Sequence, residues 1–146
     1  MTMITYTVFP GPQAHKGIDK KEITSTWDAF CMRVASAQEY PDKSSQPLIK
    51  LARFSSHRTA AHSLRHDANV MWVTGIEGDY DRGEVRMEQA VEMLERACVR
   101  AVLHSSASST PDKPRWRVLC PLSEKRTPDA RAALVARLNG VLGGIL

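Results

Sequence analysis

From residue 48 to the end of the chain, short β-prone runs alternate with stretches of helical period, and this alternation most constrains the fold. Strands are predicted at residues 48–54, 70–76, 99–103 and 116–122, and helices at residues 87–98 and from Thr127 onward. This order, β-β-α-β-β-α, favours a mixed or antiparallel sheet with helices packed on one face. We therefore expect an α+β fold.

The two predicted helices carry clear local signals. Apolar side chains recur at helical spacing at Met87, Ala90, Val91, Leu94 and Cys98. Thr127 is placed to cap the last helix, with Pro128 at its first helical position. The inner face of that helix is predicted to consist of Leu134, Leu138, Val141 and Leu142.

The N-terminal third reads differently from the remainder of the chain. Residues 4–9 are β-prone, and Thr24 or Ser25 is placed to cap a helix that runs to about Ala37. We describe residues 1–47 as a helix-containing segment and residues 48–146 as the α+β core. A chain of 146 residues has room for one compact domain with a substantial core.

The composition is that of an ordinary globular protein, with 42% hydrophobic residues and a net charge of +4. The positive charge favours polyanionic partners only weakly. The three cysteines are too widely spaced for a zinc site or a disulfide framework. No stretch reads as a signal peptide or a membrane span, so we expect no membrane partner and a cytoplasmic location, in a bacterial cell or a phage-infected host.

Three carboxylates follow the strand predicted at residues 70–76, at Glu77, Asp79 and Asp81. In extended backbone, residues two apart point the same way, with side-chain origins roughly 6–7 Å apart. Magnesium and manganese prefer oxygen ligands, and such pairs of carboxylates serve phosphoryl and nucleotidyl transfer. The alternative is a solvated acidic turn that ends a strand.

The strand predicted at residues 116–122 follows a basic segment. Alternation places Arg115, Arg117 and Leu119 on one face, and Trp116 and Val118 on the other, core face. Guanidinium groups match phosphate oxygens, so the two arginines are candidates to bind a triphosphate or a nucleic-acid backbone. Alternatively, they pair with the three carboxylates as structural salt bridges.

Other polar segments carry weaker signals. His57, His62, His66 and His104 lack the spacing of a zinc site. Residues 105–110 are rich in serine and form either a flexible loop or a turn that contacts phosphate. No general base is placed beside any of these serines, so a serine nucleophile is not supported.

Four blocks of the sequence resemble the archaeo-eukaryotic primase superfamily, in its phage- and plasmid-associated primase–polymerase branch. The blocks are SLRHDAN at residues 63–69, TGIEGDYD at 74–81, TPDKPRWRVL at 110–119 and LNGVLGG at 138–144. Together they cover most of residues 48–144. In this order they are far more specific than an acidic pair.

The resemblance implies an RRM-like catalytic sheet that makes primers or extends DNA with a divalent metal. The family's metal-binding Asp-x-Asp pair falls on Asp79 and Asp81, with Glu77 adjacent. The family's triphosphate-contacting histidine is matched by Ser109, which cannot supply a cationic imidazole. The third acidic motif would lie beyond Leu146, so the primase–polymerase core is expected to be incomplete.

Two hypotheses follow from this resemblance. In the first, the chain performs Mg²⁺- or Mn²⁺-dependent nucleotidyl transfer in DNA replication, in impaired form, on a DNA or RNA template with a nucleoside triphosphate. Asp79 and Asp81 would then be catalytic. The phosphate-binding candidates are Lys113, Arg115, Arg117 and Ser109, and the nucleic-acid-binding candidates are Arg58 and Arg65.

In the second hypothesis, the chain is a non-catalytic protein of a phage or mobile element. It would use the primase-derived scaffold to bind nucleic acid or a nucleic-acid-handling protein complex, for example as an inhibitor. The serine at position 109 and the expected lack of the third acidic motif motivate this alternative.

Overall fold

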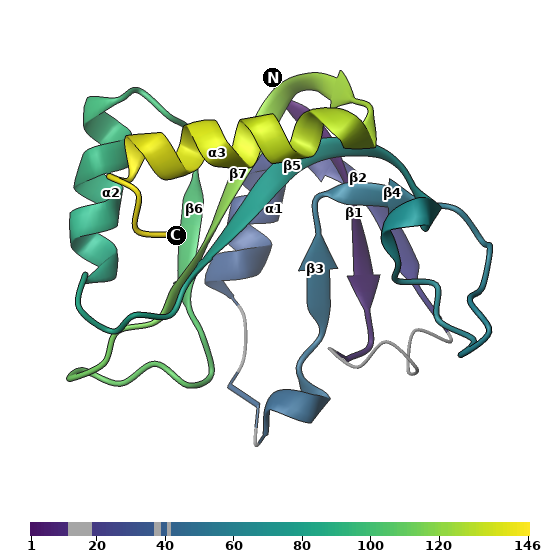
Figure 1. Cartoon of the computed structure of the whole chain (residues 1–146), viewed down its shortest axis with the longest axis horizontal. Helices are drawn as coiled ribbons and strands as arrows, with labels where there is room; N and C mark the ends of the chain where they lie inside the picture. Colours follow the sequence, from purple (N-terminus) through teal and green to yellow (C-terminus); the bar gives the residue numbers. More distant parts are fainter. Residues whose placement is uncertain (12–18, 37–38, 41) are drawn as a thin grey trace.

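The computed structural model describes residues 1–11, 19–36, 39–40 and 42–146, and within them the chain forms two antiparallel sheets and three α-helices (Figure 1). The first sheet has the order β2-β1-β3, with β1 at Met3–Phe9, β2 at Lys21–Thr26 and β3 at Leu48–Lys50. The second has the order β4-β5-β7-β6, with β4 at Ala52–Phe54, β5 at Val70–Tyr80, β6 at Val102–Ser105 and β7 at Trp116–Arg126. The helices are α1 at Trp27–Ala35, α2 at Met87–Arg96 and α3 at Arg131–Val141.

The α+β class is confirmed, and every strand pairing is antiparallel. The predicted strand at residues 48–54 is divided at Leu51, because β3 pairs with β1 in one sheet while β4 pairs with β5 in the other. The Leu51 carbonyl accepts hydrogen bonds from Thr74 N at 2.8 Å and Gly75 N at 3.1 Å. Leu51 is fully buried, so its backbone polar groups need these partners at the crossing between the sheets.

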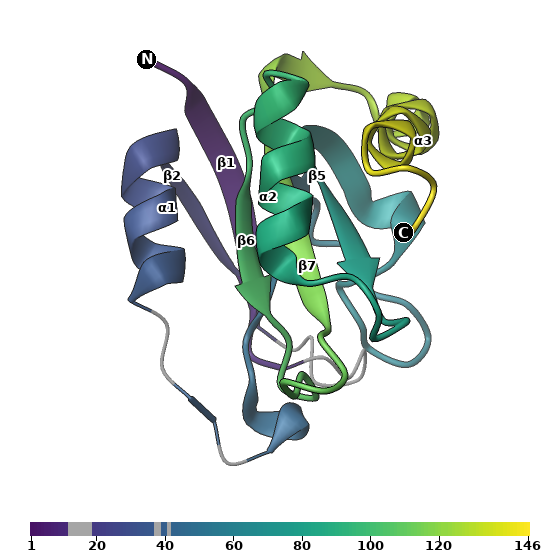
Figure 2. The same cartoon turned by 90° about the vertical axis from the view of Figure 1, so that its left-hand side faces the viewer.

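The two faces of the β4-β5-β7-β6 sheet are covered by different elements (Figure 2). α2 and α3 cover one face over a core formed by Ile76, Tyr80, Ala90, Leu94, Trp116, Val118, Cys120, Leu138 and Leu142. On the other face, Leu119 packs in a cluster with Ile4, Tyr6, Trp27, Phe30 and Leu51. The prediction of helices on one face therefore holds for α2 and α3, whereas α1 and the first sheet lie on the opposite side.

The N-terminal prediction needs two corrections. Residues 21–26 form β2, which the sequence did not reveal, because β1 supplies the pairing that stabilises this polar strand. The α1 helix consequently begins later, and its N-cap is Thr26, whose hydroxyl accepts a hydrogen bond from Ala29 N at 3.2 Å, rather than Thr24 or Ser25. The helix ends at Ala35, and Ala37 lies outside the described residues.

Boundaries in the core also differ from those predicted. β5 extends through the expected acidic turn to Tyr80, because pairing with β7 continues to the end of the strand. β6 begins at Val102 rather than at residue 99, after α2 ends at Arg96. Thr127 makes no side-chain cap, and a short 3₁₀ turn at Pro128–Ala130 precedes α3. In the described part of the chain, no helix has the length and apolar character needed to cross a bilayer.

Candidate functional site

The register of the second sheet brings the central predicted site residues onto one face. Asp79 lies directly opposite Arg117 of β7, and Arg117 lies opposite His104 of β6. Glu77 lies two residues before Asp79 and opposite Leu119, so it shares their face. This face points away from α2 and α3, whose core is built from the alternate residues of β5 and β7.

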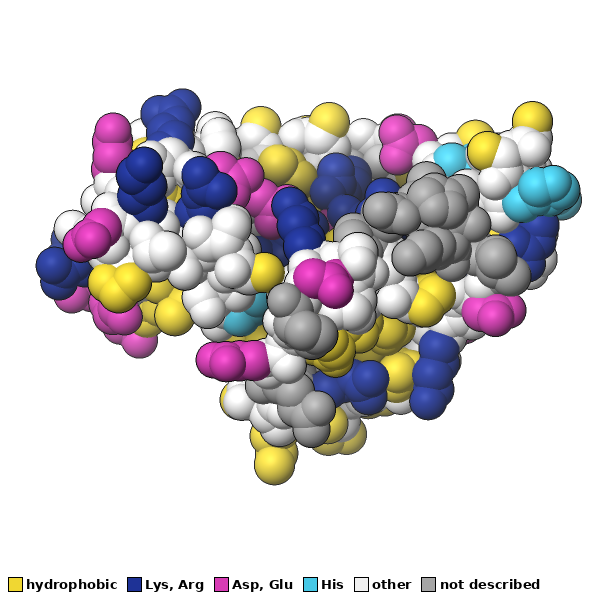
Figure 3. All heavy atoms as spheres, turned by 90° about the horizontal axis from the view of Figure 1, so that it is seen from below, with side chains coloured by type: hydrophobic (Ala, Val, Ile, Leu, Met, Phe, Trp, Pro, Cys, Tyr) yellow, Lys and Arg dark blue, Asp and Glu magenta, His cyan; other side chains and the backbone are white. Residues whose placement is uncertain are grey.

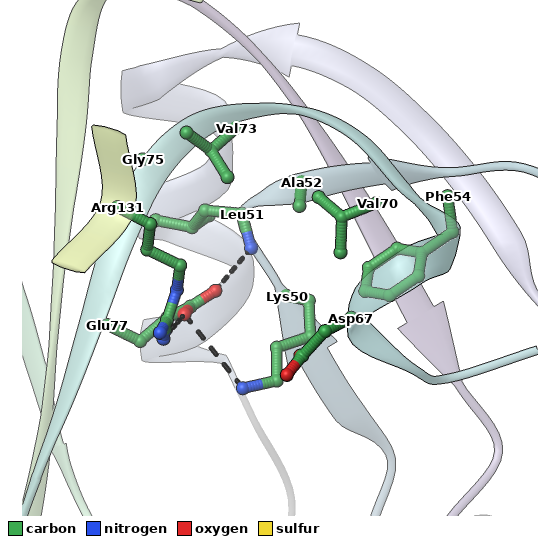
Figure 4. Close-up of a pocket in the computed structure, with 10 residues that line it drawn as sticks. All are labelled: Lys50, Leu51, Ala52, Phe54, Asp67, Val70, Val73, Gly75, Glu77 and Arg131. Carbon is green, nitrogen blue, oxygen red and sulfur yellow. Dashed lines mark hydrogen bonds and ion pairs between the residues drawn. The ribbon is translucent and has the colours of Figure 1, made fainter. Parts of the chain in front are cut away.

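Glu77 is a buried carboxylate with partners at both oxygens, and its side chain is 4% exposed. One oxygen, Oε1, accepts a 2.6 Å hydrogen bond from the backbone N–H of Leu51. The other, Oε2, lies 3.1 Å from an Arg131 guanidinium nitrogen and 3.9 Å from Lys50 Nζ (Figure 4). Glu77 thus connects the crossing between the sheets to the start of α3, which is a structural role.

Asp79 is held by a two-point contact with Arg117. The Nε and Nη2 atoms of Arg117 donate to the two carboxylate oxygens at 2.7 Å and 3.2 Å. The Arg117 side chain is only 15% exposed, whereas that of Asp79 is 58% exposed. For Arg117, the structure therefore realises the salt-bridge alternative considered from the sequence, and a metal at Asp79 would have to share both carboxylate oxygens with the guanidinium.

Asp81 follows the last residue of β5 and is exposed to solvent. Within the described ranges, no group of three or more histidine, cysteine, aspartate or glutamate side chains is arranged to hold a metal ion. Both oxygens of Glu77 and both oxygens of Asp79 already accept from nitrogen donors. The donor set in this arrangement does not fit the divalent metal that the family resemblance implies.

The loop between β6 and β7 carries the remaining phosphate-binding candidates. The Ser109 hydroxyl accepts a 3.0 Å hydrogen bond from the backbone N–H of Arg115, and Arg115 Nη1 donates to the Ser108 hydroxyl at 3.3 Å. Lys113 closes a tight turn with Thr110 and lies against Gly83, just after Asp81. The loop therefore lies at the same end of the sheet as Asp79. The Ser109 hydroxyl, however, is used for a hydrogen bond within the loop.

Arg58 and Arg65 are not part of this arrangement. Both precede β5, whereas Asp79 lies near the end of that strand. Nine residues of extended chain span about 30 Å. Arg58 Nη1 donates to the His62 carbonyl at 3.1 Å, within its own segment. The structure does not bring these two arginines together with the predicted carboxylates.

Sequence reasoning missed three residues of this face: Lys50, His104 and Arg131. Lys50 ends a short strand, and Arg131 opens the last helix, so neither stands in a recognisable motif. His104 was considered only as a zinc ligand, and its one other signal was that it directly follows the strand predicted at residues 99–103. Seen from below, lysine and arginine side chains lie among acidic ones, so the basic residues do not form a continuous surface (Figure 3).

Titration of Lys50 reflects this mixed environment. Burial lowers the pKa of Lys50 from its ordinary value of 10.5, and the positive charges of Arg117 and Arg131 lower it further. Glu77 and Asp79 act in the opposite direction and raise that pKa. Lys50, Arg117, Arg131 and the two carboxylates therefore belong to one electrostatic cluster.

Comparisons with protein-family models, with curated proteins and with solved structures return no match for this chain.

Proposed function

We propose that the chain is a primase–polymerase-like domain of DNA replication in which metal-dependent nucleotidyl transfer is impaired, and which retains the binding of phosphate-bearing ligands. The observation that carries this proposal is the pairing of both strand carboxylates with cations of the protein. Asp79 is paired with Arg117, and Glu77 with Arg131 and Lys50. Such pairs leave little carboxylate free to bind Mg²⁺ or Mn²⁺.

The strand order supports the proposed ancestry. An RRM-like sheet places the first and third strands of a β-α-β-β-α unit side by side, with both helices on one face. Here β5, α2, β6, β7 and α3 follow one another in this order, and β5 lies next to β7. β4, from the preceding segment, fills the edge beside β5 that a strand after α3 would otherwise take.

The fate of Ser109 supports the impairment. Its hydroxyl is used to close the loop on Arg115 N. A neutral hydroxyl in this role supplies no positive charge to an incoming triphosphate.

The decisive experiment is a primer-extension assay with a labelled nucleoside triphosphate and Mn²⁺, on the wild type, Asp79→Ala and Ser109→His. We expect no incorporation above background by the wild type or by Asp79→Ala. We also expect Ser109→His to remain inactive, because Arg117 still occupies Asp79. Robust Mn²⁺-dependent incorporation by the wild type that disappears in Asp79→Ala would overturn the proposed impairment.

The same ion pairs favour a second candidate: a non-catalytic phage or mobile-element protein that binds a nucleic-acid-handling protein complex, for example as an inhibitor. The two candidates differ in what binds to the charged face, by which we mean the side of the sheet that carries Glu77, Asp79 and Arg117 together with Lys50 and Arg131. Charge reversal of the cations, as in Arg131→Glu, should abolish binding of single-stranded DNA if the face holds phosphates. Unchanged DNA binding by that folded variant would favour a protein partner at another surface.

A further inference from the structure

Lys50 is a largely buried cation with unused hydrogen-bonding capacity. Its side chain is 26% exposed, and its ammonium approaches Glu77 only to 3.9 Å, beyond hydrogen-bonding distance. It makes no hydrogen bond with any residue that the structure describes. An ammonium carries three N–H donors, and the described residues use none of those of Lys50, so they are available to an acceptor that enters from solvent.

Arg131 presents a second set of donors beside the same carboxylate oxygen. One of its guanidinium nitrogens lies 3.1 Å from Glu77 Oε2, the atom that Lys50 also approaches. Its other N–H groups have no partner among the described residues, and the side chain is 43% exposed. Two cations from different elements thus converge on one point, and both have donors to spare.

The charged groups around this point are of both signs. Lys50 and Arg131 contribute two positive charges to the pocket lining, Glu77 and Asp67 contribute two negative ones, and Arg117 is paired with Asp79. Arg117 and Arg131 are close enough to Lys50 to oppose its protonation. A phosphate oxygen in this position would accept charge-assisted hydrogen bonds from the unused donors of Lys50 and Arg131.

A pocket of about 120 Å³ lies beside these side chains (Figure 4). Its apolar wall contains Phe54, Val70 and Val73, and Lys50, Glu77, Arg131 and the exposed Asp67 complete the lining. This space is large enough for a small oxyanion such as a phosphate group.

We propose that Lys50 and Arg131 bind a phosphate group directly and without a divalent metal. This inference deepens the proposed function, because it names the ligand chemistry of the charged face. Glu77 orients both cations while its own oxygens stay bonded. This binding needs no divalent ion. Mg²⁺ would instead compete with Lys50 and Arg131 for the phosphate oxygens, because it binds the polyphosphate in solution.

The test is calorimetric titration of the full chain with tripolyphosphate and with inorganic phosphate, in EDTA and then in Mg²⁺. We expect binding in EDTA and equal or weaker binding in Mg²⁺. In EDTA, Lys50→Gln should lose about tenfold or more in affinity, in line with a lost charge-assisted hydrogen bond. Lys50→Arg should retain binding.

The matched control is Lys43→Gln, which removes the same charge from an exposed lysine outside the pocket and should bind like the wild type. Absence of binding in EDTA, a strict requirement for Mg²⁺, or equal losses in Lys43→Gln and Lys50→Gln would each overturn the inference. Thermal unfolding of each variant confirms that it is folded. Failure here is distinct from failure of the proposed impairment of nucleotidyl transfer, which is decided by nucleotide incorporation.

Discussion

The two faces of the β4-β5-β7-β6 sheet solve different problems with the same strands. On one face, Tyr80 and Trp116 stack at 4.7 Å beneath α2 and α3, and both side chains are almost fully buried. On the other, Asp79 pairs with Arg117, and Glu77 pairs with Arg131 near the crossing to the first sheet. The apolar face therefore stabilises the core by packing, whereas the charged face is the one to which we assign the proposed binding of phosphate.

The largest effect should come from Trp116→Ala on the apolar face. Trp116 is 1% exposed, stacks on Tyr80 and donates its indole N–H to the Val85 carbonyl at 2.9 Å. Truncation of a buried tryptophan typically costs about 3–5 kcal/mol, which urea unfolding would measure. Trp72→Ala is the control, because that ring is partly exposed beneath Arg53 and Lys125 and should cost less. Equal losses of stability in the two variants would show that the buried face contributes no more to stability than a partly exposed position does.

Glu77→Ala should have the next largest effect, on the charged face. It leaves the Leu51 N–H and two cations without their carboxylate, at the buried crossing between the sheets. Loss of one partner from a buried polar group costs about 1–3 kcal/mol. Glu77→Gln keeps an acceptor for Leu51 N and should lose less stability in the same denaturant titration. If both variants unfold like the wild type, Glu77 is free for chemistry and its structural role is refuted.

Asp79→Asn should change stability little, below about 1 kcal/mol, because the carboxylate is mostly exposed and its ion pair is screened by solvent. Glu92→Gln is a matched control, since it breaks the exposed pair of α2 with Arg96. Thermal unfolding would measure both variants. A loss of several kcal/mol in Asp79→Asn alone would show that Asp79 is a structural residue like Glu77. Both carboxylates of the charged face would then contribute to stability.

The sequence predicted the apolar face better than the charged one. Helical spacing identified Ala90 and Leu94, and strand alternation identified Trp116 and Val118, because burial on a regular element leaves a periodic trace. Alternation also placed Glu77 and Asp79 on one face. It could not show that Arg117 is paired with Asp79, because the pairing depends on the register between β5 and β7. Lys50 and Arg131 were beyond prediction, since they reach Glu77 from separate elements across long stretches of sequence.

The smallest expected effect is the dependence of stability on pH that comes from Lys50. Its pKa in the folded chain is lowered from 10.5, first by burial, so between the two pKa values the unfolded chain binds more protons than the folded one. Stability therefore gains from this group as pH rises through that window, and the gain is complete above 10.5. Lys50→Met lacks the titration, so the free energy of unfolding of the wild type should rise relative to that of Lys50→Met over this range. Saturating tripolyphosphate should shrink the difference, because a bound anion favours the protonated ammonium and raises its pKa. If the free energies of unfolding of the two proteins changed in parallel with pH, Lys50 would titrate as an ordinary surface lysine. The proposed phosphate site would then lack the buried cation on which it depends.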